Sequence, residues 1–336
     1  MHPTAPAAYI AALALAVAAS WLLVSFVLRH AGRFGLWATP GERQSHDRTT
    51  PTGAGLGLVL ALIITSVLLE HYLAIDPGWL LIVIPVIGAL TVVGALDDRY
   101  SVSAVLRLLI QFAVSFALLG WLETHWLELD WWHWLIGATA VVWVMNVYNF
   151  MDGSHGMAGF QGVFAGLVLF ALFARQGEPA LALPALLLAG VCAGFLPLNF
   201  PVARIFMGDA GSVPLGFALA ALIGLGFSQG ALSLAAGLLV LSVFLVDSTL
   251  TLFKRVIGGE RWYTAHKQHI YQRLIDHGWP HSRVLLLYQA INLVLVAPAI
   301  MLAGMYPELA WGMAGIVFLL LTTGWVAASL RLGMRK

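Results

Sequence analysis

Charged residues are scarce in this chain of 336 residues. Asp, Glu, Lys and Arg make up 10% of it, compared with roughly 25% in an average soluble domain. Hydrophobic residues make up 60%, so the composition indicates an integral membrane protein. Seventeen basic and 16 acidic residues leave a net charge of +1. This balance provides no basic surface for nucleic acid, and we expect no nucleic-acid partner.

Cysteine is nearly absent, because Cys192 is the single one. One thiol excludes a disulfide within the chain and any zinc or iron–sulfur site built from cysteines. Cys192 lies in an apolar run, which is typical of a small buried side chain.

Long apolar runs dominate the sequence. A helix needs about 20 apolar residues to cross a bilayer, and about eleven runs of that order are present. There is no repeat of 20 to 50 residues and no stretch long enough for a soluble domain, so we expect one all-α, polytopic membrane domain over residues 1–336. The runs lie near residues 8–28, 55–73, 78–96, 105–122, 134–151, 157–174, 180–198, 212–228, 231–253, 284–303 and 310–330.

The basic residues predict the orientation of these spans. No Lys or Arg precedes the first run and a basic segment follows it, so we expect a retained span with the N-terminus outside and the C-terminus in the cytoplasm. Every Lys and Arg except Arg175 then lies in or beside a cytoplasmic segment. These segments are 29–54, 97–104, 152–156, 199–211, 254–283 and 331–336. The first five are expected to form a cytoplasmic active site.

Acidic residues near span ends need a reason, since an Asp at the centre of a membrane helix costs roughly 2.5–3.5 kcal/mol. Asp97 and Asp98 end the third run in GALDDRYSVS. Adjacent carboxylates repel unless a cation lies near them, and Mg²⁺ prefers oxygen ligands together with substrate phosphate. The alternative is a solvated loop in which Arg99 neutralises the pair.

Two further stretches carry polar residues at predicted cytoplasmic ends. In NVYNFMDGSHG, Asn146, Asn149 and Asp152 recur at i, i+3 and i+6, which places them on one helix face. That face lines either a helix–helix seam or a water-filled cavity. In NFPVARIFMGDAGS, Asp209 precedes a helix predicted to begin near Ser212. Helix starts attract anions, so a carboxylate and a phosphate are compatible there only if Asp209 holds a metal ion.

The last large loop contains KRVIGGERWYTAHKQHIYQRLIDHGWPHSR. The pattern predicts a short amphipathic helix from about Thr264 to His277, with His266, His269 and Arg273 on one face. The loop is basic enough to bind lipid headgroups in general or one specific diphosphate. Two histidines three residues apart are too weak a signal for zinc.

In this order, the stretches SHDRTTPTGAG, DDRYS, NVYNFMDGSHG, FMGDAGS and HKQHIYQRL resemble the polyprenyl-phosphate N-acetylhexosamine-1-phosphate transferases of the glycosyltransferase family 4 type. The superfamily includes the phospho-N-acetylmuramoyl-pentapeptide translocase. The resemblance covers about His46 to Arg273. It implies transfer of an N-acetylhexosamine-1-phosphate from a UDP-sugar to undecaprenyl phosphate, release of UMP, and a requirement for Mg²⁺ or Mn²⁺.

The resemblance also implies roles for individual residues. Asp97, Asp98 and Asp209 would be catalytic, with Asp209 and Asp98 as the expected metal ligands. Phe206 would lie beside uracil, although the residue alone is equally typical of a membrane anchor. The remaining expected substrate-binding residues are Arg48, Asn146, Asn149, Asp152, His266, His269 and Arg273. We favour positioning or metal assistance for Asp97 and Asp98 over proton abstraction or nucleophilic attack.

Two positions depart from the family pattern. Ser101 and His155 stand where many relatives have acidic residues. With these two residues, the chain resembles the branch that initiates O-antigen or other surface glycans more than it resembles the pentapeptide translocase. That branch acts in lipopolysaccharide and cell-wall biogenesis. We therefore expect an enzyme of the bacterial cytoplasmic (inner) membrane whose active site faces the cytoplasm. The sequence leaves open whether it forms a homodimer.

The strongest alternative is an ion- or proton-coupled membrane transporter. Such a protein should place polar residues near the bilayer midplane and at both mouths, whereas here they cluster at one side. Asp247, deeper in the ninth run, fits that alternative best, although a structural partner for a nearby helix is the favoured interpretation.

Overall fold

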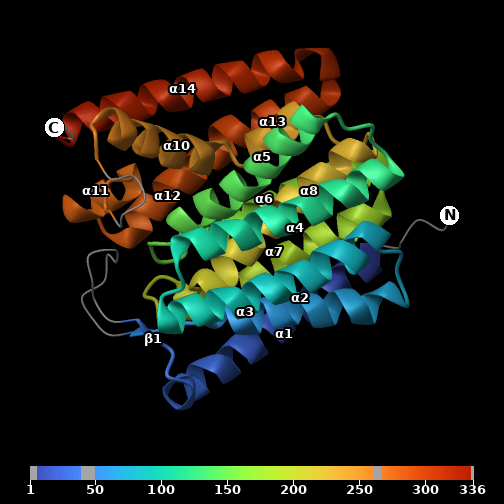
Figure 1. Ribbon diagram of the computed structural model, residues 1–336, viewed down its shortest axis with the longest axis horizontal. Helices are drawn as coiled ribbons and strands as arrows, with labels where there is room; N and C mark the ends of the chain where they lie inside the picture. Colours follow the sequence, from blue (N-terminus) through green and yellow to red (C-terminus); the bar gives the residue numbers. More distant parts are fainter. Residues whose placement is uncertain (1–5, 39–49, 261–265, 334–336) are drawn as a thin grey trace.

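The computed structural model describes residues 6–38, 50–260 and 266–333. Figure 1 shows a bundle of long helices in which α1 begins at one end and α14 ends at the other. The first half of the described chain contains α1 (Pro6–Phe34), β1 (Trp37–Ala38), β2 (Thr50–Pro51), α2 (Ala54–Glu70), a π-helical turn (Trp79–Val83), α3 (Ile84–Tyr100), α4 (Ala104–His125) and α5 (Trp131–Phe150). The second half contains α6 (Met157–Gln176), α7 (Pro179–Asn199), α8 (Asp209–Ser228), α9 (Leu234–Val240), α10 (Ser242–Ile257), α11 (Ile270–Asp276), α12 (His281–Ile291), a second π-helical turn (Asn292–Val296), α13 (Ala297–Met305), a 3₁₀ turn (Pro307–Leu309) and α14 (Ala310–Arg331).

The helices confirm the all-α, polytopic membrane class. Among the described residues, 8 helices are long and apolar enough to cross a membrane, and a bent pair, α9 with α10, would make 9. The second predicted run forms α2, an apolar helix of 17 residues. The fifth forms α5, whose end carries Asn146 and Asn149. The count of eleven spans and the orientation of the termini stay predictions.

The ninth predicted run is not one straight helix. α9 and α10 meet at a bend of 76°, because the chain leaves helical geometry at Leu241. The backbone carbonyl of Val240 at this break accepts a hydrogen bond from Nε2 of Gln161 in α6, at 3.0 Å. A side chain thus satisfies a backbone group that a continuous helix would have satisfied itself.

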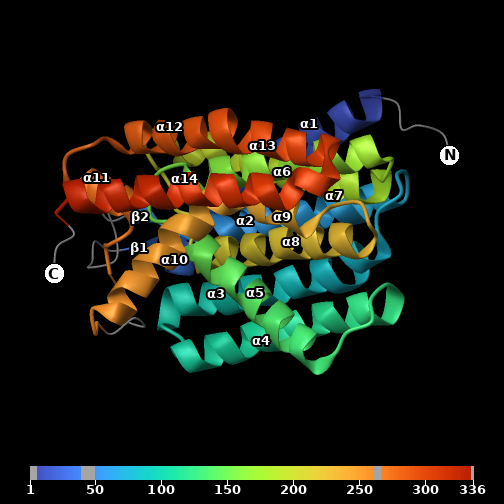
Figure 2. The same ribbon diagram turned by 90° about the horizontal axis from the view of Figure 1, so that it is seen from above.

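Close helix packing fixes the start of α8, a helix in the middle of the bundle (Figure 2). With α7, α8 is the most buried of the candidate membrane spans. A Cβ atom added at Gly94 of α3 would lie 2.5 Å from backbone atoms of Asp209 and Ala210. A Cβ at Gly55 of α2 would overlap the backbone of Gly211. Small residues let membrane helices approach this closely. Glycine at these two positions therefore places α2 and α3 against the first turn of α8.

A short antiparallel pairing closes the same end of the bundle. β1 pairs with β2, with Trp37 opposite Pro51. The carbonyl of Pro51 accepts a hydrogen bond from the backbone N–H of Phe206 at 2.8 Å. The segment before α8 is therefore held by β2 on one side and by α2 on the other, where Gly55 N donates to Met207 O at 3.0 Å.

Candidate active site

The carboxylate of Asp98 caps α8. Its Oδ1 accepts a hydrogen bond from Asp209 N at 3.0 Å, and its Oδ2 accepts one from Ala210 N at 3.4 Å. The preceding residue, Gly208, has a φ of 74°, a conformation that favours glycine. A Cβ there would also collide with Asp98 Oδ2. The cap explains why α8 begins at Asp209 and not near Ser212, as the sequence predicted.

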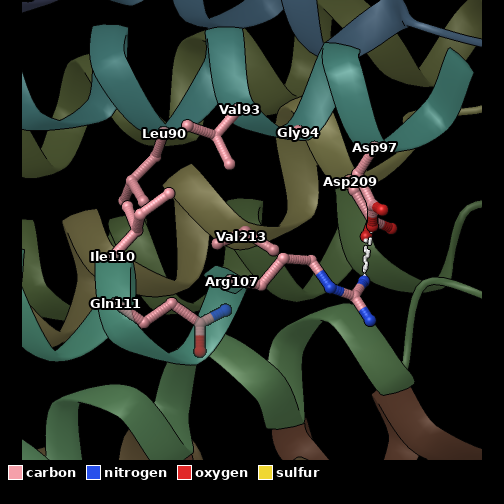
Figure 3. Close-up of a pocket in the computed structure, with 9 residues that line it drawn as sticks. All are labelled: Leu90, Val93, Gly94, Asp97, Arg107, Ile110, Gln111, Asp209 and Val213. Atoms are coloured by element: carbon pink, nitrogen blue, oxygen red, sulfur yellow. Dashed lines mark hydrogen bonds and ion pairs between the residues drawn. The ribbon is translucent and has the colours of Figure 1, made fainter. Parts of the chain in front are cut away.

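Arg107 of α4 joins Asp97 and Asp209, which lie on α3 and α8. Its Nη1 lies 2.5 Å from Asp97 Oδ2 and 3.2 Å from Asp209 Oδ2. Figure 3 shows the guanidinium reaching toward both carboxylates. Because one nitrogen contacts both, the carboxylates of Asp97 and Asp209 converge on one point in space. Two carboxylates this close repel each other, and the positive charge of Arg107 offsets that repulsion.

Asn149 of α5 completes the shell around Asp209. Its Nδ2 donates to Asp209 Oδ1 at 2.7 Å and to Ser212 Oγ at 2.9 Å. Asn146, one turn earlier, contacts a different group: its Nδ2 donates to Gln111 Oε1 of α4 at 2.7 Å. The polar face of α5 therefore has two parts. Asn146 belongs to a helix–helix seam with α4, and Asn149 borders the carboxylate cluster that Asp97, Asp98 and Asp209 form.

Asp152 lies beyond the end of α5, where its backbone N–H donates to Asn149 O at 3.2 Å. Burial raises the pKa of its carboxyl well above the usual value, and the nearby carboxylates of Asp209 and Asp98 raise it further. A backbone N–H at Gly208 acts in the opposite direction. The four aspartates at the predicted cytoplasmic ends of different spans thus form one cluster.

Phe206 lies beside a pair of stacked imidazoles. The rings of His155 and His281 are stacked, with centroids 3.9 Å apart, and the Phe206 centroid lies 6.2 Å from that of His155. Ser154 Oγ lies within hydrogen-bond distance of His281 Nδ1, at 2.9 Å. His155, which departs from the family pattern, is therefore part of an aromatic surface and not of the carboxylate cluster.

The loop that carries His266 and His269 differs from its prediction in where its helix begins. α11 spans Ile270–Asp276 only, so the predicted helix start near Thr264 is wrong; residues 264 and 265 lie outside the described residues. His269 is the N-cap and His266 precedes it in an irregular segment, because Asp247 Oδ1 accepts the first helical N–H, that of Ile270, at 2.9 Å. The two imidazoles are still brought together, with ring centroids 4.9 Å apart.

These side chains carry unused polar atoms. In the part of the chain that the structure describes, Nδ1 of His266, Nδ1 of His269 and Nε of Arg273 are buried without a hydrogen-bond partner. Burial lowers the pKa of His266 to about 3, and it also lowers that of His269. Both imidazoles are therefore neutral at pH 7, so of the three predicted phosphate-binding residues only Arg273 carries a positive charge.

Asp247 anchors this region. Besides Ile270 N, its carboxylate accepts hydrogen bonds from Tyr288 OH at 2.6 Å, Trp325 Nε1 at 3.2 Å and Thr251 Oγ1 at 3.3 Å. These donors lie on α10, α11, α12 and α14, so Asp247 is a structural partner of neighbouring helices. The residue that fitted a transporter best therefore has its oxygens committed to protein donors.

The low pKa of His266 predicts a loss of stability in acid. The unfolded chain takes up a proton near the ordinary value of 6.5, whereas the folded chain takes it up only near pH 3. Unfolding then binds more protons within this window, and stability falls as the pH drops from 6.5 toward 3. We expect His266→Gln to reduce proton uptake on unfolding by about one proton per chain.

Thermal unfolding in detergent micelles between pH 7.5 and 4.5 measures this effect. The unfolding midpoint of the wild-type protein should fall more steeply with acidity than that of His266→Gln. His277→Gln, at an exposed position after α11, is the matched control and should follow the wild type. Parallel curves for wild type and His266→Gln would contradict the expected uptake.

The carboxylate cluster fits a divalent cation such as Mg²⁺. Mg²⁺ usually binds one or two carboxylates and completes its shell with water and substrate phosphate. Asp97 and Asp209 provide two carboxylates aimed at one point. Within the described ranges, no group of three or more His, Cys, Asp or Glu residues could hold a metal ion by itself. The donor set thus fits a cation shared with substrate phosphate and not an all-protein site.

Sequence reasoning missed Arg107, Gln111 and Tyr271. Arg107 was considered only for its charge, although its place one turn into α4, after the Asp97–Asp98 pair, was a signal for an ion pair. The buried Tyr271 donates its OH to Phe150 O at 2.9 Å, and a Cβ at Gly153 would overlap that hydroxyl. It thereby packs α11 against the end of α5. Of the predicted site residues, Arg48 lies outside the described residues.

Comparison with known proteins gives consistent matches. The model of glycosyl transferase family 4 matches residues 79–226. The chain is 29% identical over 299 residues to a probable undecaprenyl-phosphate N-acetylglucosaminyl 1-phosphate transferase of Bacillus subtilis (strain 168), covering 84% of this chain and 81% of that protein. It is 30% identical over 308 residues to the decaprenyl-phosphate N-acetylglucosaminephosphotransferase of Mycolicibacterium smegmatis, covering 80% and 75%. It is 33% identical over 279 residues to the phospho-N-acetylmuramoyl-pentapeptide-transferase of Synechococcus sp. (strain JA-3-3Ab), covering 75% and 79%.

Proposed function

The chain belongs to glycosyl transferase family 4, and from that membership we propose that it transfers an N-acetylhexosamine-1-phosphate from a UDP-sugar to undecaprenyl phosphate. The reaction releases UMP and leaves a polyprenyl-diphosphate sugar in the cytoplasmic membrane. The product initiates O-antigen or another cell-surface glycan. N-acetylglucosamine is the first sugar to test, because the names of two relatives specify it.

One observation supports this proposal most strongly. Asp97, Asp209 and Asn149 lie on three different helices. Arg107 contacts the carboxylates of Asp97 and Asp209 within 3.2 Å, and Asn149 donates a hydrogen bond to Asp209 at 2.7 Å. The cluster lies at the end of the bundle, beside a pocket whose other lining residues are apolar except for Gln111. A reaction between a lipid phosphate and a nucleotide sugar needs such a place, where charged groups border the membrane.

The cluster has to bring two anions together. A lipid phosphate has a second pKa near 6 and is already mostly dianionic at neutral pH, so it needs no strong base to act as nucleophile. Asp97 and Asp98 are therefore assigned positioning roles. Asp98 fixes the first turn of α8 and so the carboxylate of Asp209, while Asp97 holds Arg107. Positioning of this kind is the main protein contribution to phosphoryl transfer.

We assign Asp209 as the ligand of a divalent cation, Mg²⁺ or Mn²⁺, with Asp97 as the carboxylate that converges with it. The cation would neutralise diphosphate oxygens and stabilise the leaving UMP. Asp98 as a further ligand stays a prediction, since both its oxygens accept backbone hydrogen bonds.

The nucleotide is assigned to the aromatic surface next to the cluster. Phe206, His155 and His281 form an aromatic cluster against which a uracil can pack, and the carboxyl of Asp152 lies near those of Asp209 and Asp98. The unpartnered buried nitrogens of His269 and Arg273 are assigned to phosphate oxygens, with His269 as a neutral donor and Arg273 as the charged one.

The proposal is tested by UMP release from the purified full-length protein in detergent. The assay contains undecaprenyl phosphate, Mg²⁺ and one of a panel of UDP-N-acetylhexosamines. We expect release with at least one sugar, and its loss when the lipid phosphate is omitted or when EDTA is added. Release without the lipid would indicate a nucleotide-sugar hydrolase. Absence of release with every sugar would overturn the proposal, and cation transport in proteoliposomes would then be the measurement for the transporter alternative.

A further inference from the structure

A polar network lies at the bend between α9 and α10. Gln161 of α6 donates its Nε2 to the backbone carbonyl of Val240 at 3.0 Å. Its Oε1 accepts a hydrogen bond from Nδ2 of Asn292 at 2.8 Å, and Asn292 begins the π-helical turn that follows α12. Gln161 and Asn292 are 0% and 1% exposed. Both ends of the Gln161 amide are therefore used to tie a break in one helix to a second helix.

This network costs stability. Within the described ranges, Oδ1 of Asn292 and Nε2 of Gln289 are buried without a hydrogen-bond partner. An apolar side chain of similar size at either position would leave no polar atom unsatisfied. Polar residues that a membrane bundle retains at such a cost are typical of a role beyond stability. The network does what apolar packing cannot do, because it satisfies the Val240 carbonyl and so keeps the helix bent.

The bend sets the direction of α10. α9 and α10 meet at 76°, and Figure 2 shows α10 running obliquely while α12 and α14 run along the bundle. α10 carries Asp247 seven residues after Val240, about 10 Å along a helix axis. Oδ1 of Asp247 accepts the N–H of Ile270, the first residue of α11, at 2.9 Å. The direction of α10 therefore decides where α11 begins, and with it the places of His269 and Arg273.

The span that begins with α12 is connected to the bent segment at two points. Tyr288 OH donates to Oδ2 of Asp247 at 2.6 Å. One turn later, Asn292 reaches the break at Val240 through Gln161. Two connections seven residues apart fix the direction of the segment, whereas one connection would act as a pivot.

α10 has further polar contacts beyond Asp247. Trp143 Nε1 of α5 donates to Thr249 Oγ1 at 3.0 Å, and Lys254 Nζ donates to Ser329 Oγ of α14 at 3.1 Å. Both contacts lie on the far side of Asp247 from the break. Gln161 and Asn292 hold the segment on the near side, where the chain changes direction.

We propose that Gln161 and Asn292 are positioning residues of the transferase. By holding the bend between α9 and α10, they fix Asp247 and, through it, His269 and Arg273. This assignment rests on the proposed function, in which His269 and Arg273 bind phosphate oxygens. It adds two residues that act through those groups and do not belong to the carboxylate cluster.

Steady-state UMP release gives the first test. Gln161→Met removes both hydrogen bonds of the amide and keeps the length of the side chain, and Asn292→Leu removes one of them. Each should lower kcat/KM for the UDP-sugar about tenfold, the effect of losing one hydrogen bond to a charged group. Gln289→Met is the matched control, because Gln289 lies on α12 and accepts from Asn292 only at 3.4 Å. It should stay within about twofold of the wild type.

An Arg273→Gln background separates positioning from a general loss of stability. If Gln161 acts through Arg273, the two substitutions affect one interaction and their effects are not additive. Gln161→Met should then lower kcat/KM by about threefold or less in this background. The full tenfold loss in the Arg273→Gln protein would overturn the proposal.

Pulsed EPR in detergent measures the bend without turnover. Leu234→Cys and Ile257→Cys place spin labels at exposed positions, the first residue of α9 and the last of α10. The single native cysteine is removed by Cys192→Ala. Two helical segments of about 10 Å and 24 Å that meet at 76° span about 28 Å, whereas one straight helix of these residues spans about 34 Å.

We expect Gln161→Met to shift this distance toward the longer value. Without the Gln161 amide, the Val240 carbonyl can be satisfied by the backbone donor that a continuous helix supplies. Gln289→Met should leave the distance unchanged. An unchanged distance in Gln161→Met would overturn the proposal, and so would a longer distance with an unchanged kcat/KM. If the distance shifts but the wild-type protein releases no UMP with any sugar, the proposed function is contradicted and only the fixing of the bend stands.

Discussion

Asp209→Asn is expected to fold and to lose UMP release by about 100-fold or more, the loss typical of removing one group that stabilises charge in the transition state. The wild-type carboxylate accepts from Asn149 at Oδ1 and from Arg107 at Oδ2. An asparagine presents an amide NH₂ to one of these donors, so one contact becomes a donor facing a donor. It also removes the charge that a divalent cation requires.

The fold should tolerate this change. The cap of α8 uses the backbone N–H of residue 209 and the carboxylate of Asp98, and neither depends on the side chain at 209. Circular dichroism and the unfolding midpoint should therefore match the wild type. Asp276→Asn, an exposed acidic position at the end of α11, controls for the loss of one negative charge. If Asp209→Asn keeps activity within about threefold of the control, Asp209 is not the cation ligand.

Asp247→Ala is expected to destabilise the protein by about 2–4 kcal/mol. The substitution leaves Ile270 N, Tyr288 OH and Trp325 Nε1 without their acceptor. Each buried unsatisfied donor costs about 1–3 kcal/mol, although interhelical hydrogen bonds in membranes average nearer 0.6 kcal/mol. The start of α11 is released as well, so His269 loses its fixed position.

Unfolding in mixed detergent and SDS micelles measures this cost. Thr251→Val is the matched control, because it removes only a hydrogen bond of 3.3 Å to the same carboxylate and should cost less than about 1 kcal/mol. Tyr288→Phe should lie between the two. A stability of Asp247→Ala equal to that of Thr251→Val would show that the network does not hold these helices together.

Much of the fold could be predicted from the sequence. Long apolar runs and scarce charges determine a polytopic helical membrane protein, because the bilayer leaves few ways to satisfy backbone polar groups. The ordered motifs identified the family and directed attention to Asp97, Asp98, Asn149, Asp152 and Asp209. All five lie in one connected cluster, which hydropathy and motif order were sufficient to indicate.

Local patterns failed where a distant residue decides the backbone. The helix predicted from Thr264 begins at Ile270 because Asp247, 23 residues away, accepts its first N–H. The ninth run bends by 76° at a carbonyl that Gln161, 79 residues away, satisfies. Periodicity describes one segment at a time, so it contains no information on either partner.

The sequence by itself determined which residue types the site contains, because composition and motifs are local properties of the chain. Only the tertiary structure decided their tasks. It gave Arg107 two carboxylates, one of them 102 residues away, assigned Asp98 to the cap of α8, and separated Asn146 from Asn149. These outcomes depend on how closely helices pack, as at Gly55 and Gly94, and that distance is set by the surfaces of two helices together.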